Sequence, residues 1–232
     1  IPWKAVPVAE DMSIRAKDYE KENGGIIFPN PNAPTGLFMP LDQVEEIVRA
    51  NEDVIVIVDE AYIDFGAWSA MELTKKYDNL LVVQTFSKSR AMAGMRIGFA
   101  AGNPELIRAL NNVKYSYNSY TMSLAAQELG AAALRDRDYF EETRKKIIST
   151  RERAKKRLRE LGFSFPDSMT NFIFAEHCRA EARPMFQAMK EAGIYVRYFD
   201  KPGLDNRLRI TIGTEEEMEQ LYRFLERYLA DR

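Results

Sequence analysis

The chain has 232 residues, of which 46% are apolar and 29% charged, and its net charge is −2. This balance is typical of a folded globular chain of one or two domains and excludes an intrinsically disordered one. Because the sequence has no basic stretch and no apolar run near the roughly 20 residues that span a bilayer, we expect no nucleic-acid partner and no membrane partner. Cys178 is the single cysteine, so no intrachain disulfide can form, and a cytoplasmic location fits.

The first 135 residues alternate short apolar runs with helical patterns. The run at 54–58 is unbroken and β-branched, which is typical of a strand buried on both faces of a parallel sheet. Asn103 followed by Pro104 predicts the start of a helix, with the asparagine as N-cap. Strands are expected at 26–28, 54–58, 80–84 and 97–101, and helices at 41–51, from 104 onward and at 122–134.

The remainder of the chain begins with a long, charged amphipathic helix at 138–161. Strands are then expected at 171–175, 194–198 and 208–212, and helices at 184–192 and 215–229. Strands that alternate with helices predict an α/β protein with a mostly parallel sheet. We expect a boundary near Asp136 between a parallel-sheet domain at 1–135 and a smaller α/β domain at 136–232.

Polar side chains collect where the predicted strands end. In open parallel sheets, ligands bind at the carboxyl ends of the strands. A lysine after a strand is usually a solvated surface charge, and an aspartate there is usually a turn or capping residue. Their joint placement at one edge instead indicates a binding site. The candidates are Asn32, Asp59, Tyr62, Ser87, Lys88 and Arg96.

These residue types match the needs of a pyridoxal phosphate site. The cofactor requires a lysine that holds its aldehyde as a Schiff base and an acid that keeps its ring nitrogen protonated. Its phosphate requires hydroxyl groups, backbone N–H groups and an arginine, and its ring oxygen requires hydrogen-bond donors. The sequence offers a candidate for each of these roles.

Four segments, in this order and spacing, resemble the class I/II aminotransferases of fold type I, and most of all their histidinol-phosphate aminotransferase subfamily. The segments are Asn32-Ala33-Pro34-Thr35-Gly36, Asp59-Glu60-Ala61-Tyr62, Thr85-Phe86-Ser87-Lys88 and Gly94-Met95-Arg96-Ile97-Gly98. The resemblance extends from about Val8 to the C-terminus. It implies that pyridoxal 5'-phosphate is the cofactor, that residues 1–135 are the large domain that binds it, and that the protein is a homodimer.

Carried over residue by residue, the resemblance implies a role for each candidate. Lys88 would form the Schiff base and then act as the acid and base of the proton shift. Asp59 would pair with the protonated pyridine nitrogen, and Arg209 would bind the substrate carboxylate. Hydrogen bonds to the ring oxygen would come from Tyr62 and Asn32, and contacts with the phosphate from Thr85, Ser87 and Arg96.

A second arginine, Arg197, precedes Arg209 on a neighbouring predicted strand. Along 208–212 the apolar residues share one face, so Arg209 points the other way. For Arg197, a solvent-facing position on an antiparallel sheet is an equally weighted interpretation. The functional interpretation is a two-arginine clamp that accepts either the phosphate of histidinol phosphate or the side-chain carboxylate of glutamate. Because segment 193–197 matches the histidinol-phosphate subfamily, we favour Arg197 as a phosphate ligand.

Two further groups of residues have simpler interpretations. His177 and Cys178 are adjacent, but no other ligand lies near them in the sequence, so we expect no metal site. Tyr115, Tyr117 and Tyr120 are candidates for a pocket lining, although packing in the core or at a subunit interface is the expected role.

The expected reaction converts histidinol phosphate and 2-oxoglutarate to imidazole acetol phosphate and glutamate, as part of histidine biosynthesis. The partners would be a small-molecule amino donor and a 2-oxo acid. An aromatic amino-acid aminotransferase, a phosphate-substrate decarboxylase and a non-catalytic cofactor-binding regulatory domain are the alternatives. The resemblance begins inside the family's pattern, about a third of the way along, so we expect the chain to be part of a larger protein and to have little activity alone.

Overall fold

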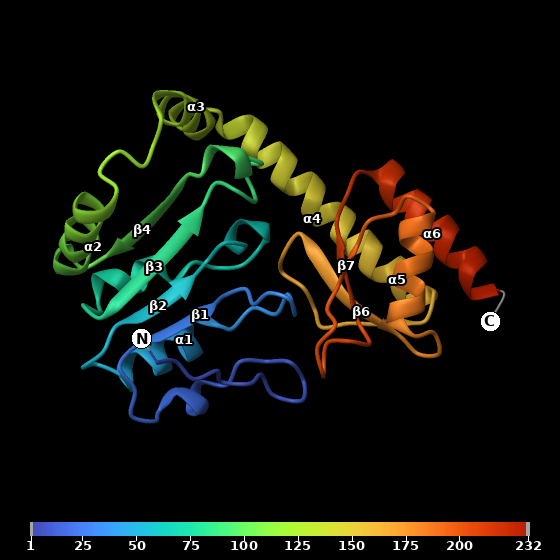
Figure 1. Ribbon diagram of the computed structural model, residues 1–232, viewed down its shortest axis with the longest axis horizontal. Coiled ribbons are helices and arrows are strands. Elements are labelled where there is room, and N and C mark those ends of the chain that lie inside the picture. The colour runs from blue at the N-terminus through green and yellow to red at the C-terminus, as the bar shows by residue number, and fades with distance from the viewer. Residues whose placement is uncertain (1, 231–232) are drawn as a thin grey trace.

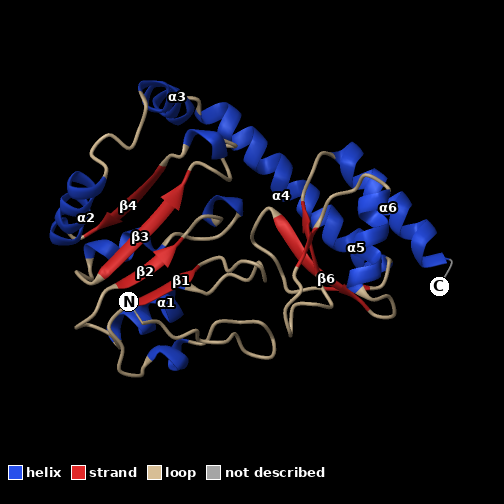
Figure 2. Ribbon diagram, viewed as in Figure 1, coloured by secondary structure: helices blue, strands red, loops and turns tan. Residues whose placement is uncertain are grey.

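The structure is a computed structural model and describes residues 2–230. Within this range the strands form two separate four-stranded sheets, which a long helix connects (Figures 1 and 2). No helix among the described residues is both long enough and apolar enough to cross a membrane.

The larger sheet has the strand order β1-β2-β3-β4. Its strands are β1 (Ile26–Pro29), β2 (Val56–Asp59), β3 (Leu80–Thr85) and β4 (Gly98–Gly102). The first three strands are parallel, whereas β4 runs antiparallel to β3. The connection before β4 carries only the short 3-10 helix η4 (Ala93–Met95), and a parallel return would need a longer crossover, usually through an α-helix. The prediction of a mostly parallel α/β fold is confirmed.

One face of the larger sheet carries the apolar core. The helix α1 (Leu41–Arg49) packs there with Val44 and Ile47, and β2 contributes Val56 and Val58; all four side chains are fully buried. Each such side chain contributes about 1.5–3 kcal/mol relative to an exposed one. The short 3-10 helices η1 (Ala16–Tyr19) and η3 (Ala70–Lys75) complete this layer.

The opposite face of β1 and β2 is largely uncovered within the described residues. Ile27 is 70% exposed and Ile55 is 43% exposed, while Ile57 is half-buried. The prediction that 54–58 is buried on both faces is therefore wrong for this chain. The physical reason is that α1, η1 and η3 pack on the other face only.

Three helices follow β4, namely α2 (Pro104–Tyr117), α3 (Leu124–Arg135) and α4 (Arg137–Glu160). The predicted start of α2 is confirmed, because the Asn103 side chain accepts a hydrogen bond from the Glu105 amide at 2.7 Å. Asp136 lies between α3 and α4, and its carboxylate caps α4 by accepting from the Tyr139 amide at 3.2 Å. From there α4 runs to the smaller sheet (Figure 1).

The smaller sheet is antiparallel and has the order β5-β6-β8-β7. Its strands are β5 (Phe163–Ser164), β6 (Phe172–His177), β7 (Arg197–Tyr198) and β8 (Leu208–Thr211), and its helices are α5 (Ala182–Glu191) and α6 (Glu215–Ala230). It has an apolar core of its own, built around fully buried Ile173, Met185 and Leu225. The strand predicted at 194–198 is reduced to two residues, and the two-residue strand β5 was too short to produce a periodic pattern.

Candidate active site between the two sheets

The carboxyl ends of β1, β2 and β3 meet at one edge of the larger sheet, and this edge faces the smaller sheet (Figure 1). Pro29 at the end of β1 is in register with Asp59, and Asp59 is in register with Val83 of β3. Neighbouring strands lie about 4.8 Å apart. The residues that follow these strands are therefore brought to a common edge, as expected for a ligand site in a parallel sheet.

The two consecutive acids at the end of β2 point in different directions. Glu60 is 1% exposed, and its carboxylate accepts hydrogen bonds from the Ser69 hydroxyl at 2.6 Å, the Ala70 amide at 2.6 Å and the Gln84 amide at 2.8 Å. Burial raises the pKa of this carboxyl above its ordinary value. Asp59 is half-buried and accepts only the Ala61 amide, at 3.0 Å, among the described residues. Of the two acids, Asp59 is therefore the one whose carboxylate can still accept a hydrogen bond from a ligand.

Lys88 lies in the loop that follows β3, and its side chain is exposed. Its Nζ lies 5.5 Å from the centre of the Tyr62 ring. Within residues 2–230 its amine has no hydrogen-bond or ion-pair partner. It also borders an open groove of about 1220 Å³, which runs along α4 to the start of α6. The amine is thus accessible to a small molecule.

The Lys88 loop is held on both sides of the lysine. The Ser89 hydroxyl donates to the Asp64 carboxylate. Arg90 donates to the Ala133 carbonyl at 2.8 Å, near the C-terminal end of α3, and its guanidinium lies 4.0 Å from the centre of the Phe140 ring. Since these contacts fix the backbone next to Lys88, they restrict where its amine can reach.

Two of the three predicted phosphate ligands lie together. The Thr85 and Ser87 hydroxyl oxygens are 2.9 Å apart, and the Ser87 amide donates to the Thr85 oxygen at 3.1 Å. Arg96 is exposed, has a left-handed backbone with φ of 55°, and donates to the Ala93 carbonyl at 2.9 Å. The structure gives no direct contact between Arg96 and the two hydroxyls, so its role as phosphate ligand stays a prediction.

A row of side chains links the larger sheet to Arg209 of the smaller one. The Tyr62 ring meets the Phe172 ring edge-on, with centroids 5.1 Å apart and planes at 88°. On Phe172 lies the Arg209 guanidinium, 5.0 Å from the ring centre. Lys88, Tyr62, Phe172 and Arg209 therefore form a continuous series of contacts between the two sheets.

The two predicted clamp arginines lie opposite each other on neighbouring strands. Arg197 of β7 is in register with Arg209 of β8, so both side chains project from the same face of the smaller sheet. Both guanidinium groups lie near the Phe199 ring, at 5.4 Å and 5.8 Å from its centre. The Arg209 Nε is buried and has no hydrogen-bond partner among the described residues. Arg197 is exposed, and neither arginine pairs with a carboxylate in the part of the chain that the structure describes.

Asn32 has no hydrogen bond to another candidate among residues 2–230. It is 7% exposed, and its backbone amide donates to the Leu37 carbonyl at 2.7 Å. Its side chain borders a second cavity of about 500 Å³, together with residues 11 and 13–17. The loop that carries it follows β1 at the shared edge, but its hydrogen bond to the cofactor stays a prediction.

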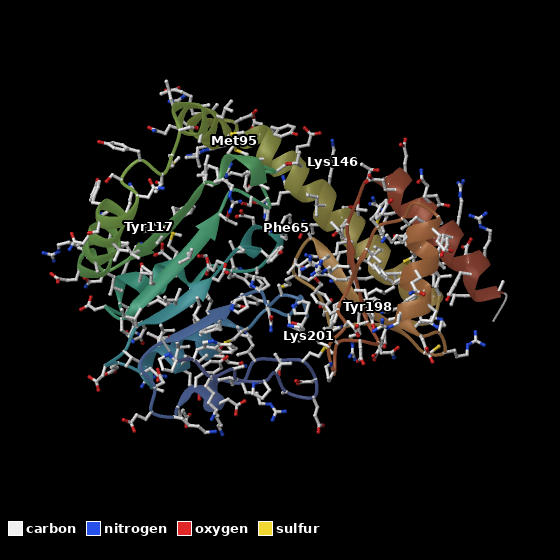
Figure 3. All side chains as sticks on the ribbon, viewed as in Figure 1. Phe65, Met95, Tyr117, Lys146, Tyr198 and Lys201 are labelled. Carbon is white, nitrogen blue, oxygen red and sulfur yellow. The ribbon has the colours of Figure 1, made fainter. Side chains whose placement is uncertain are left out.

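The remaining sequence candidates lie away from this row. His177 Nδ1 accepts amide hydrogen bonds from Arg179 at 3.2 Å and Ala180 at 2.9 Å, while Nε2 lies 3.0 Å from the Leu161 carbonyl. Burial lowers the pKa of this imidazole. Of the two roles predicted for the three tyrosines, packing in the core does not hold among the described residues, and packing at a subunit interface stays a prediction. Tyr115 is 64% exposed, and Tyr117 (labelled in Figure 3) and Tyr120 are 91% and 95% exposed.

Sequence reasoning missed two residues of the site region. Phe172 joins Tyr62 to Arg209, and Arg151 of α4 is a buried cation beside the same row. Phe172 lies in a predicted strand, but an apolar residue there gave no signal beyond core packing. Arg151 lies in the charged helix predicted at 138–161, where nothing in the pattern distinguishes it from the other arginines and lysines.

Comparison with known proteins defines the class. The model of the family "Aminotransferase class I and II" matches residues 1–225, and the chain belongs to this family. The chain is 48% identical over 232 residues to the histidinol-phosphate aminotransferase of Lactococcus lactis subsp. cremoris strain MG1363, covering 100% of this chain and 65% of that relative. It is 53% identical over 215 residues to the histidinol-phosphate aminotransferase of Brachyspira hyodysenteriae, covering 92% of this chain and 61% of the relative. It thus spans less than two thirds of these curated relatives.

A solved structure agrees with this assignment. The histidinol-phosphate aminotransferase of Sinorhizobium meliloti, in complex with pyridoxal-5'-phosphate, superposes with a TM-score of 0.84 at 27% identity, covering 98% of this chain and 64% of that structure.

Proposed function

We propose that the chain is part of an aminotransferase that uses pyridoxal 5'-phosphate to transfer the amino group of histidinol phosphate to 2-oxoglutarate. The observation that carries this proposal is the contact series Lys88–Tyr62–Phe172–Arg209, which links an accessible amine on the larger sheet to a guanidinium on the smaller one. That guanidinium has no carboxylate partner among the described residues. Two relatives of about 50% identity bear the name of this activity and support the choice of substrate.

The residues present fit the cofactor. Lys88 supplies an exposed amine with no partner among the described residues, and Asp59 supplies a carboxylate at the same sheet edge with capacity for one more proton donor. The Thr85 and Ser87 hydroxyls, 2.9 Å apart, form a polar pair suited to a phosphate oxygen. When bound, the cofactor supplies an electron sink for charge that develops on the substrate α-carbon.

The protein's own residues would then manage protons and orientation. The Asp59 carboxylate would hold a proton on the ring nitrogen, and the Tyr62 hydroxyl would donate a hydrogen bond to the ring oxygen. The Lys88 amine would take the proton from the substrate α-carbon and return it to a neighbouring atom of the cofactor. Arg209 would bind the α-carboxylate and fix the substrate's orientation, since a guanidinium binds a carboxylate through two parallel hydrogen bonds.

Arg197 would select the distal group of the substrate. It lies directly opposite Arg209, so the pair offers two guanidinium groups to one molecule with anionic groups at both ends. Histidinol phosphate presents a phosphate to such a clamp, and glutamate and 2-oxoglutarate present a second carboxylate.

The organisation of the enzyme belongs to the same proposal. Residues 1–135 would form the cofactor-binding large domain and 136–232 the small domain, which is consistent with the separate apolar cores of the two sheets. The enzyme would be a cytoplasmic homodimer. Large apolar side chains exposed on α2 and α3, among them Val113, Tyr117 and Leu124 at 67%, 91% and 73%, support a subunit interface there.

The test uses the intact protein. Addition of pyridoxal 5'-phosphate should produce the visible absorption band of lysine-bound cofactor, and Lys88→Ala should abolish it. Lys146→Ala is the matched control, because Lys146 borders the same groove and is exposed on α4 (Figure 3). The absence of this band from the wild type would refute cofactor binding. A panel of amino donors with 2-oxoglutarate then tests the substrate, and preference for an aromatic amino acid over histidinol phosphate would refute that part.

A further inference from the structure

Arg151 is a buried cation that binds two segments far apart in the sequence. It lies on α4 and is 4% exposed. Its Nη1 donates to the Phe65 carbonyl at 2.7 Å and to the Thr170 carbonyl at 3.0 Å, and its Nε donates to the Glu152 carboxylate at 2.8 Å. One guanidinium nitrogen thus holds a carbonyl from each side of the space between the two sheets.

Both carbonyls belong to segments that carry the candidate site. Phe65 ends the 3-10 helix η2 (Ile63–Phe65), which begins directly after Tyr62, and the Phe65 amide donates to the Tyr62 carbonyl at 3.2 Å. Thr170 lies two residues before Phe172. Figure 3 shows Phe65 in the region between the larger sheet and the smaller one, beside α4.

The helix α4 makes a second contact with η2. Arg144, two turns before Arg151, donates to the Asp64 carbonyl at 3.3 Å. The Arg151 bonds connect η2 to Thr170, just before β6, and the Met169 amide donates to the Gly36 carbonyl at 2.9 Å as a second connection between the two halves. Tyr62 meets Phe172 of β6 through ring contact. Directed hydrogen bonds to buried carbonyls restrict distance and angle more strongly than the edge-on contact of two rings does.

We propose that Arg151 is a positioning residue that fixes the separation of Tyr62 from Phe172 and Arg209, and through it the spacing between the cofactor half and the carboxylate-binding half of the site. This inference rests on the proposed function. Arg151 touches neither substrate nor cofactor in this role. It acts through the two carbonyls, so its loss should loosen the binding of any dicarboxylate held by Arg209.

A purely structural role would be shared by its neighbour Lys155. Lys155 lies one turn further along α4 and is also 4% exposed. Its ammonium pairs with the same Glu152 carboxylate at 2.9 Å and with Asp167 at 2.7 Å, and none of its hydrogen bonds reaches η2. Lys155→Met therefore removes a buried cation of the same helix without removing the Arg151 hydrogen bonds that join η2 to Thr170.

The experiment compares Arg151→Met, Arg151→Lys and Lys155→Met in the intact protein loaded with pyridoxal 5'-phosphate. Three quantities are measured: the urea midpoint of unfolding, the Kd of glutarate by calorimetry, and amide hydrogen exchange in segment 61–67. Glutarate is a dicarboxylate without an amino or keto group, so it reports binding and not turnover.

We expect Arg151→Met to lose stability, because it removes the donor to the carbonyls of Phe65 and Thr170, two fully buried residues. Lys155→Met removes a partner only from the Glu152 and Asp167 carboxylates, which are 52% and 75% exposed, so its loss of stability should be smaller. Only Arg151→Met should raise the Kd of glutarate, by on the order of tenfold to a hundredfold, as small misplacements within a site do. It alone should also speed exchange in 61–67. Arg151→Lys retains a donor without the planar guanidinium and should recover part of the affinity.

The outcomes separate this inference from the function on which it rests. Equal changes of the glutarate Kd in Arg151→Met and Lys155→Met, or no change in either, overturn the positioning role. If Arg151→Met does not fold, a wild-type Kd in Arg151→Lys together with unchanged exchange overturns it. A wild-type protein that binds neither cofactor nor glutarate refutes the proposed function itself.

Discussion

The contact between Phe172 and Arg209 can be tested by a single substitution. Phe172→Leu keeps an apolar side chain in a position that is 2% exposed, but it removes the ring that faces Tyr62 at 5.1 Å and Arg209 at 5.0 Å. An aromatic pair contributes about 0.5–1.5 kcal/mol beyond burial, and a cation over a ring contributes about 0.5–2 kcal/mol. The free energy of unfolding should therefore fall by about 1–3.5 kcal/mol.

The functional effect follows from the Arg209 side of this contact. If the guanidinium loses about 1 kcal/mol of support in its binding orientation, the KM for 2-oxoglutarate should rise roughly fivefold. Urea unfolding and steady-state kinetics on the intact, cofactor-loaded protein measure the two effects. Phe28→Leu is the control, because Phe28 is 1% exposed and contacts an aromatic ring, Tyr19 at 5.8 Å, in the core beneath the larger sheet.

Both variants should lose stability, and only Phe172→Leu should raise the KM. An unchanged KM in Phe172→Leu, despite a stability loss like that of Phe28→Leu, would refute the reasoning. Phe172 would then be an ordinary core residue.

Three further predictions address other parts of the chain. Arg197→Ala should reduce kcat/KM for a phosphorylated amino donor by at least tenfold more than for an aromatic one, since an arginine–phosphate pair is charge-assisted, and equal losses would contradict the clamp. Because burial lowers the folded-state pKa of His177, the unfolded chain takes up the proton first as pH falls. The stability that neutral His177 provides is therefore complete above the ordinary histidine pKa and is lost as pH falls through the folded pKa. Between roughly pH 7.5 and 5.5, the free energy of urea unfolding should fall less in His177→Gln than in the wild type, and equal falls would contradict this. Glu60, whose pKa is raised, also changes stability with pH, but it is present in both proteins and its effect cancels in the comparison. Thr214→Ala should lower the free energy of unfolding by about 0.5–2 kcal/mol, because Thr214 caps the start of α6. Its hydroxyl accepts a hydrogen bond from the Glu217 amide at 3.3 Å, and the Glu217 carboxylate accepts one from the Thr214 amide at 2.7 Å. Glu216→Ala is the control, and an equal melting temperature for the two variants would contradict the capping role.

The sequence was most informative where local pattern determines local structure. The β-branched run before Asp59 and the apolar run before Thr85 predicted two strands, and the rule for parallel sheets placed their ends together. The helix start at Asn103 followed from capping preferences, which depend on neighbouring residues only. These features need no knowledge of distant contacts.

The features that the sequence did not predict depend on tertiary contacts. Nothing in the pair Asp59-Glu60 indicates which acid is buried, because the answer lies in Ser69, Ala70 and Gln84. Likewise, Arg151 occupies one position in a helix rich in arginine and lysine. Its burial becomes visible only when Phe65 and Thr170 are brought to it from distant parts of the chain.

The register of Arg197 with Arg209 depends partly on local pattern and partly on tertiary contacts. Alternation along 208–212 correctly predicted that Arg209 points away from the apolar core, on which Leu208 and Ile210 are 1% exposed. The pairing partner of each residue depends on how two strands align, and alternation within one strand leaves that alignment undetermined.

The uncovered face of β1 and β2 in the larger sheet should lower the solubility of the polypeptide. Ile27 and Ile55 lie on that face, and within the described residues β1 and β4 are edge strands with unpaired backbone groups on one side. Exposed apolar surface next to open edge strands favours strand addition between molecules and aggregation. A preparation of these 232 residues alone is therefore expected to precipitate as its concentration rises, and light scattering against concentration would measure this directly.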